Sequence, residues 1–182
     1  MTSPDERINH DGLCVLTPVV AGHEAQLSRH LRDLPRRGQS PMIRAPGTHY
    51  ARWAVVQLEG PDGKPLPPEV EPAHLLFASE FDGLLEPYLR RMCVRLAEDA
   101  HEIWRHCEGY PGRDPDALAD YLIDHRVKPG YSVVAYPEAS LERVRRAFAL
   151  RERLNDFLVR TATLDSPGLQ HAWEQRFRGG ER

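Results

Sequence analysis

The sequence lacks the features that would place it in several large classes of protein. No apolar run in its 182 residues is longer than four, whereas a helix that crosses a bilayer needs about 20 apolar residues. Lys and Arg number 24 against 27 Asp and Glu, so the net charge of −3 gives no basic surface for nucleic acid. We therefore expect neither a membrane partner nor a nucleic-acid partner.

Cysteine is also scarce, at three residues, and no Cys-x-x-Cys pair occurs. An odd number without such a pair argues against a disulfide framework and fits a reducing compartment, so we expect a cytoplasmic protein. The first eleven residues are polar, without the apolar stretch of a secretory signal. The P-loop, Gly-x-Gly-x-x-Gly and Gly-x-Ser-x-Gly motifs are missing too, which argues against nucleotide binding and serine hydrolase chemistry.

What the sequence does contain is a series of apolar patterns with the periods of strands and helices. The predicted strands cover residues 13–20, 48–58, 73–81 and 131–136. The predicted helices cover residues 23–34, 85–107, 114–122 and 140–158. Clusters of Pro and Gly separate these elements, as expected for loops.

The order of these elements predicts an α+β fold. It is the ferredoxin-like split β-α-β sandwich, a four-stranded antiparallel sheet with helices on one face, followed by an extra C-terminal helix and a tail. No internal repeat is evident, so residues 1–182 are expected to form a single domain. Within it, 1–11 is a flexible arm, 13–158 the ferredoxin-like core and 165–182 the C-terminal tail.

The second face of the predicted sheet determines the expected oligomeric state. Along the third strand, alternation directs two sets of residues to opposite sides: Leu75, Phe77, Ser79 and Phe81 against His74, Leu76, Ala78, Glu80 and Asp82. Both sides of the second strand are largely apolar. Because the helices cover only one face, the other needs a second layer, and we expect a homodimer.

At this level the chain resembles the dimeric α/β-barrel superfamily. The resemblance covers residues 13–158 through element order and patterning, and segments 46–53 and 106–111 look like signatures of a bacterial branch. Members of this superfamily are ferredoxin-like protomers whose open sheet faces pair around a cavity. They include cofactor-independent monooxygenases, small cyclases and haem enzymes. The resemblance implies a small-molecule-handling homodimer with oxygenase, isomerase or cyclase chemistry.

The candidate catalytic residues are His49, Arg52 and Asp82. A histidine titrates near neutral pH and can act as acid or base, while an arginine is always charged and can hold a carboxylate. Residues three apart on a strand face opposite sides unless a bulge intervenes, so His49 and Arg52 share a face only with a bulge. Asp82 could pair with Arg52 or cap the helix that follows.

The candidate ligand-binding residues are Glu80, Tyr136, His106 and Trp53. Glu80 shares a predicted face with Asp82, and His106 lies near a helix C-terminus, where a capping role is the alternative. His101, His106 and Glu108 do not have the spacing of a zinc site, so we expect no metal and no other cofactor.

Two other functions stay open. One is a non-catalytic interaction module that acts with a partner enzyme through its Pro-rich loop and its tail. The other is a haem-binding protein. Residues 79–83 are similar to the Gly-x-x-Asp-Gly motif of dye-decolourising peroxidases, although Ser79 replaces the first glycine and those proteins carry two ferredoxin-like units per chain.

Overall fold

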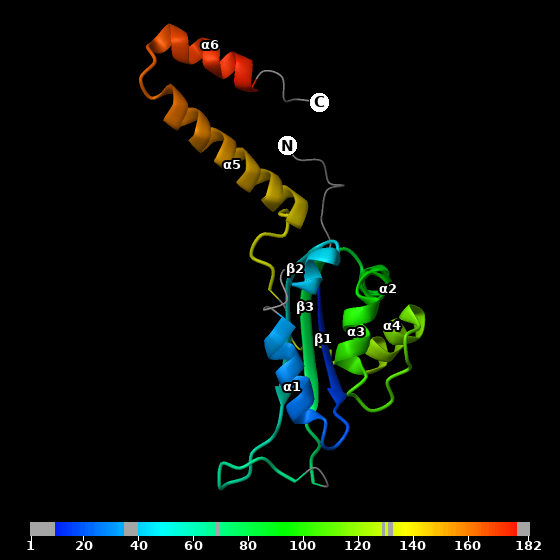
Figure 1. The fold of residues 1–182 in the computed structure, drawn as a ribbon. Coiled ribbons are helices and arrows are strands. Elements are labelled where there is room, and N and C mark those ends of the chain that lie inside the picture. The colour runs from blue at the N-terminus through cyan, green and yellow to red at the C-terminus, as the bar shows by residue number, and fades with distance from the viewer. Residues whose placement is uncertain (1–9, 35–39, 68–69, 129, 131–132, 178–182) are drawn as a thin grey trace. The chain divides into compact units, whose positions relative to one another are not determined.

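The computed structural model describes residues 10–34, 40–67, 70–128, 130 and 133–177. Its contacts divide the chain into two compact units, with the boundary after Leu141. The first unit contains β1 (His10–Pro18), α1 (Glu24–Asp33), the 3₁₀ helix η2 (Pro41–Arg44), β2 (Thr48–Val56), β3 (His74–Asp82), α2 (Leu85–Arg95), α3 (Ala97–Trp104) and α4 (Pro115–Asp124) (Figure 1). The remaining helices are α5 (Leu141–Thr161) and α6 (Ser166–Phe177).

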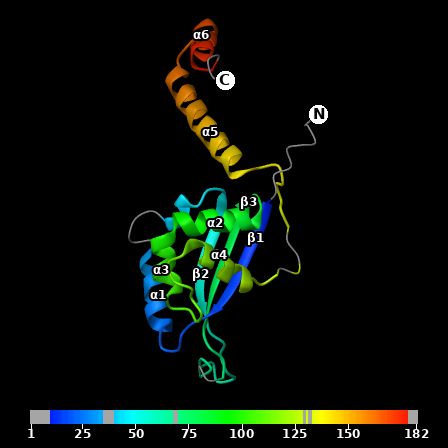
Figure 2. The same ribbon diagram turned by 90° about the vertical axis from the view of Figure 1, so that its right-hand side faces the viewer.

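The three strands form one antiparallel sheet in the order β1-β3-β2, so β3 is the central strand. Figure 2 shows α2, α3 and α4 in front of this sheet, and α1 contacts β2 and α3. The core lies between sheet and helices and includes the strand residues Leu13, Val15, Leu75, Phe77 and Phe81, with Ala51, Trp53 and Val55 packed against it. Alternation therefore directs every second strand residue inward, as the sequence predicts for the third strand.

We call the other side of the sheet the open face. Its residues range from half-buried to exposed and are Gly12, Cys14, Leu16, Tyr50, Arg52, Ala54, Leu76, Ala78 and Glu80. Tyr50 is 56% exposed, whereas Leu16 and Leu76 are half-buried. The open face is thus polar and exposed near one end and apolar further along the strands.

The prediction of a four-stranded ferredoxin-like sheet is wrong, because the sheet has three strands. Residues 125–127 approach the free edge of β1 and form only an isolated antiparallel bridge with Val15. The predicted strand over 131–136 begins outside the described residues, and residues 133–136 adopt no strand conformation. Tyr136 is 72% exposed, so strand formation there would bury little apolar surface to offset the entropy of ordering the chain.

The helix predicted over 85–107 is also two helices. α2 ends at Arg95, and Leu96, with φ −109° and ψ 15°, departs from helical geometry before α3 begins. Both helices bury the apolar residues that the periodicity assigns to the core, among them Tyr88 and Trp104. The pattern identifies the buried face correctly because a one-residue break barely changes which side chains point inward.

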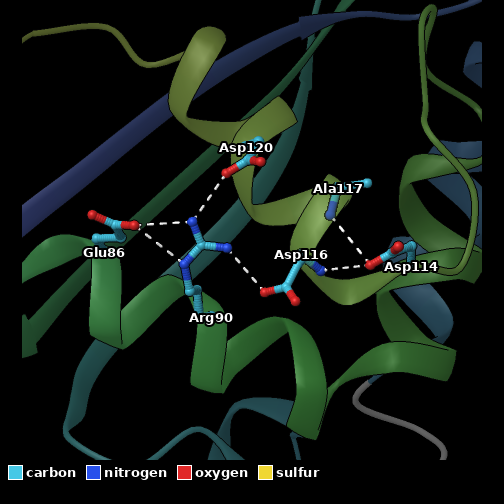
Figure 3. A network of polar contacts seen from close by, with 6 residues as sticks. All are labelled: Glu86, Arg90, Asp114, Asp116, Ala117 and Asp120. Atoms are coloured by element: carbon cyan, nitrogen blue, oxygen red, sulfur yellow. Dashed lines mark hydrogen bonds and ion pairs between the residues drawn. The ribbon is translucent and has the colours of Figure 1, made fainter.

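A surface network joins α2 to α4 (Figure 3). Arg90 donates hydrogen bonds to Glu86 at 2.9 Å, Asp116 at 2.9 Å and Asp120 at 3.3 Å. Hydrogen bonding to Glu86, and next to Asp116, raises the pKa of Arg90. The Asp114 carboxylate caps α4 by accepting the N–H of Asp116 at 2.9 Å. These hydrogen bonds connect the exposed sides of α2 and α4.

The second unit consists almost entirely of α5 and α6. Phe157 is its buried residue, and the rings of Trp173 and Phe177 approach it edge-on at centroid distances of 5.5 and 5.4 Å. α6 therefore gives regular structure to much of the predicted tail, whose role stays a prediction. None of the helices in the described part of the chain has the length and apolar character that a membrane span requires.

Candidate functional site

One side chain from each strand contributes to a cluster at one end of the sheet. The three residues are His10 in β1, His49 in β2 and Asp82 in β3, and we call them the histidine–aspartate centre. Asp82 is the last residue of the central strand and lies directly opposite His10 in the register. Because β3 lies between β1 and β2, the carboxylate has an imidazole on either side.

A β-bulge brings His49 to the open face. The register changes from Thr48 opposite Phe81 to Tyr50 opposite Glu80, so His49 is the additional residue on β2. In a regular strand, alternation would place its side chain with Ala51 on the core side. The bulge redirects the ring toward Asp82, a role that bulges commonly have near functional sites.

Gly47 allows β2 to approach the end of β3 closely. Its carbonyl accepts the N–H of Asp82 at 3.0 Å, and its φ of 82° favours glycine. A Cβ at this position would lie 3.4 Å from the Asp82 carbonyl oxygen. The glycine therefore keeps Asp82 within reach of His49, two residues further along.

The two imidazoles share one oxygen of Asp82. His49 Nε2 lies 2.6 Å from Asp82 Oδ1, and His10 Nδ1 lies 3.1 Å from the same atom. The other oxygen, Oδ2, accepts the N–H of Leu141 at 2.8 Å. Because a carboxylate only accepts hydrogen bonds, the His49 ring carries its N–H on Nε2, the nitrogen that is hydrogen-bonded to Asp82.

The three side chains differ in their exposure to solvent. The side-chain exposure is 11% for His10, 19% for Asp82 and 27% for His49. His10 Nε2 is buried and has no hydrogen-bond partner among the described residues. A molecule that arrives from solvent would therefore meet His49 first.

The strand registers arrange the open face in rows across β1, β3 and β2. From the centre along the strands, the rows are His10–Asp82–His49, Gly12–Glu80–Tyr50, Cys14–Ala78–Arg52 and Leu16–Leu76–Ala54. Glu80 and Arg52 are exposed, and neither has an ion pair within the described ranges. The rows place the charged residues near the centre and the apolar residues away from it.

The structure brings together two of the three predicted catalytic residues, His49 and Asp82, and places Arg52 two rows away. A strand rises about 3.3 Å per residue, so Arg52, three residues beyond His49 on β2, lies about 10 Å along the strand from the centre. The predicted pairing of Arg52 with Asp82 is not formed in the described part of the structure, where Asp82 contacts His10 and His49.

The predicted ligand-binding residues are dispersed. Glu80 occupies the row next to the centre, whereas Tyr136 is exposed and lies outside the strands. Trp53 faces the core and stacks on Phe77 at a centroid distance of 5.1 Å. His106 is buried beside His23, with 3.2 Å between their Nδ1 atoms. Trp53 and His106 thus have packing environments apart from the centre.

His10 is the residue that sequence reasoning did not include. It falls in the predicted flexible arm because His10-Asp11-Gly12 is polar and ends in glycine, as in a loop. In the structure the same residues continue β1 and pair with residues 80–82 of β3. The sequence signal that could have indicated this pairing is the alternation along the whole of β3. A central strand of this length needs hydrogen-bonded neighbours along both of its edges.

The three cysteines are free thiols. Burial raises the pKa of Cys93 to about 12 and that of Cys107 to about 11. Both thiols are therefore protonated at neutral pH and are poor nucleophiles. Cys14 is half-buried on the open face.

His106 and His23 form a second imidazole pair, with 3.2 Å between their Nδ1 atoms. Burial is the main cause that lowers the pKa of His106 below 6.5, followed by the charge of Arg105. His23 and His30 act in the same direction, and Glu102 opposes them.

We expect this pair to make stability depend on pH below 6.5. There the unfolded chain binds a proton at His106, while the folded chain, with its lower pKa, does not, so the free energy of unfolding falls as pH falls. Urea unfolding between about pH 5 and 8 measures this slope. His106→Gln should flatten it and His74→Gln should not; equal slopes in wild type and His106→Gln would contradict the expectation.

Comparison with known proteins identifies no relative of this chain: no family model, curated protein or solved structure matches it. The resemblance to the dimeric α/β-barrel superfamily therefore stays a prediction. The geometry of the histidine–aspartate centre and of the open face is the basis for a functional proposal.

Proposed function

We propose that the protein binds an elongated carboxylic acid on the open face and that His49 transfers a proton to or from it. The observation that carries this proposal is the 2.6 Å contact between His49 Nε2 and Asp82 Oδ1. A carboxylate in this position holds the imidazole in one tautomer and one orientation, as general acid–base catalysis requires. The partial exposure of His49 supports the same role.

Arg52 is the proposed anchor for the carboxylate of the ligand. It is exposed on the open face and forms no ion pair with another described residue, so its guanidinium is available for a bidentate contact. Its distance of about 10 Å along β2 from His49, three residues away, requires a ligand longer than acetate. Tyr50, 56% exposed, lies between the two residues on β2 and offers a ring surface and a hydroxyl group.

Isomerase or cyclase chemistry fits this arrangement best. Both reactions can proceed by removing a proton at one atom and returning one at another, for which a histidine oriented by a carboxylate is suited. Oxygenase chemistry is the third reaction class that we include in this proposal. Glu80, in the row next to the centre, would face the middle of a bound ligand and favour one that carries no second negative charge there.

Titration with straight-chain carboxylic acids, from acetate to octanoate, tests this proposal by isothermal calorimetry. We expect binding to strengthen with chain length, to weaken at least about tenfold in Arg52→Gln, and to persist in Glu80→Gln. Absence of binding by every acid of the series, or equal binding by wild type and Arg52→Gln, would contradict it.

We further propose a homodimer in which the apolar end of the open face contacts a second copy. Leu16, Leu76 and Ala54 form a row there, and Val56 is 39% exposed nearby. Burying such a surface against an identical one gives an isologous contact with two-fold symmetry. The charged rows would lie at one end of this contact and stay accessible to a ligand.

Light scattering at micromolar concentration should therefore give twice the chain mass of 20.7 kDa. Leu76→Lys should produce monomers by placing a charge in the apolar row, while Glu80→Gln should remain dimeric. A wild-type mass of 20.7 kDa would overturn the proposed dimer.

An interaction module is the second candidate, and the exposed apolar residues of α5 favour it. Phe148, Leu158 and Val159 are 51%, 55% and 80% exposed. Surfaces of this kind commonly mark contacts with other proteins. The acid titration distinguishes the two candidates: the carboxylate site predicts binding that Phe148→Ser and Val159→Ser leave unchanged, whereas an interaction module predicts no binding by any acid of the series.

A further inference from the structure

We propose that the histidine–aspartate centre binds a divalent first-row transition-metal ion, for which zinc is the probe. Sequence motifs predicted no metal, because the three residues are far apart in the sequence. His49 and Asp82, for example, are 33 positions apart. The inference goes beyond the proposed function and does not rest on it: with an ion bound at Nε2, His49 is a metal ligand and no longer donates to Asp82, so the ion-bound and ion-free centres are separate states of one site.

The donor set is one that such ions use. Imidazole nitrogen and carboxylate oxygen are common zinc ligands, and two histidines with one carboxylate also hold non-haem iron(II). Three protein ligands leave at least one coordination position open for water or for an oxygen of a substrate. The centre therefore has the composition of a catalytic metal site rather than of a closed structural one.

The distances fit an ion after a small movement. Zinc lies 2.0–2.2 Å from such ligands, so neighbouring donors of a tetrahedral site are about 3.3 Å apart. The His10 Nδ1–Asp82 Oδ1 distance is 3.1 Å and the His49 Nε2–Asp82 Oδ1 distance is 2.6 Å. All three donor atoms lie within 4.8 Å of one another. To reach this spacing, His49 Nε2 has to move away from Asp82 Oδ1 by less than about 1 Å. His49 lies at the bulge and is the most exposed of the three side chains.

The fold holds the donors in place before an ion arrives. They come from three strands that are hydrogen-bonded to one another, and His10 faces Asp82 in the register. The N–H of Leu141 occupies Asp82 Oδ2, which leaves Oδ1 as the oxygen between the two rings. Such outer contacts orient metal ligands and increase affinity.

Binding also has a cost, which limits the expected affinity. An ion bound at His49 Nε2 and His10 Nδ1 requires each neutral ring to carry its N–H on the other nitrogen. His49 can present that N–H to solvent, whereas His10 Nε2 is buried with no acceptor among the described residues. We therefore expect an affinity about 10–100-fold below that of a site with complete outer-shell hydrogen bonds.

The test is calorimetric titration of the full-length, chelator-treated protein with zinc alone, with folding checked by circular dichroism. Wild type should bind one ion per chain. Asp82→Asn and His49→Gln should each weaken binding at least about tenfold. Glu80→Gln and His74→Gln are the matched controls, since they remove a carboxylate and an imidazole from the same strand, β3, and should bind like wild type.

Two ligand variants are compared so that a lost metal ligand can be distinguished from misfolding. His49 is partly exposed on the edge strand β2, so His49→Gln should leave the fold intact. Binding that is absent from wild type, or that is as strong in Asp82→Asn and His49→Gln as in wild type, overturns the metal site. Binding lost only in His106→Gln would instead locate the ion at the His23–His106 pair and also overturn it. Octanoate titration of the same zinc-free protein is measured separately, so the acid site can fail or hold independently of the metal site.

Discussion

Asp82→Asn is expected to lower the free energy of unfolding by about 1.5–3 kcal/mol, because the charged acceptor shared by His10, His49 and the Leu141 N–H is lost. Asparagine keeps the size and one carbonyl oxygen, but its NH₂ group must face one of these donors. The same substitution should remove zinc binding and misorient His49. Urea denaturation at pH 7 measures the first effect and titration measures the second.

Glu80→Gln is the matched control for this variant. Glu80 lies on the same strand and the same face as Asp82, two residues earlier, but is exposed and has no ion pair in the described segments. Its replacement should change stability by no more than about 0.5 kcal/mol. If the two variants have equal stability, Asp82 does not link the three strands in the way that the hydrogen bonds indicate.

Trp104→Ala is expected to have the largest effect on stability, about 3–5 kcal/mol. Trp104 is 1% exposed and meets Phe77 edge-on at 5.4 Å and Trp53 at 6.4 Å. Removing the indole creates a cavity between α3 and the core side of the sheet. Because a domain of ordinary stability has about 5–15 kcal/mol, much of the folded population could be lost at elevated temperature.

Trp104→Phe separates packing from hydrogen bonding at this position. The indole Nε1 is buried without a hydrogen-bond partner among the described residues, so phenylalanine removes an unsatisfied donor while it keeps most of the ring. It should therefore recover more than half of the stability that alanine loses. An alanine variant within about 1 kcal/mol of wild type would show that Trp104 is not the centre of the core.

Local sequence patterns were sufficient to predict the three observed strands and the alternation along the third. Leu75, Phe77 and Phe81 alternate with smaller or polar residues, and a half-buried strand is the arrangement that satisfies both sets. The fourth strand was wrong because Tyr131–Tyr136 has strand propensity but strand formation also requires a partner edge. Residues 125–127 approach the free edge of β1 instead.

The candidate site was predictable only in part, because the contacts of His49 and His10 depend on the register of the strands. His49 and Asp82 could be selected because polar residues at the ends of apolar strands are costly unless they have partners. Their contact depends on a bulge, which the sequence allows but does not locate. His10 depends on strand pairing over more than 70 residues, and no local pattern distinguishes that pairing from a polar arm.

Asp82 joins His10 and His49 in one centre, and a long-range ¹H–¹⁵N spectrum of the imidazole nitrogens at neutral pH tests this arrangement most directly. We expect an Nε2–H ring for His49, because this nitrogen is hydrogen-bonded to Asp82 Oδ1. The signals of His49 and of His10, whose Nδ1 lies 3.1 Å from the same oxygen, should both change in Asp82→Asn, and the His74 signal should not. Spectra of His10 and His49 that are the same in wild type and Asp82→Asn would contradict the proposed centre.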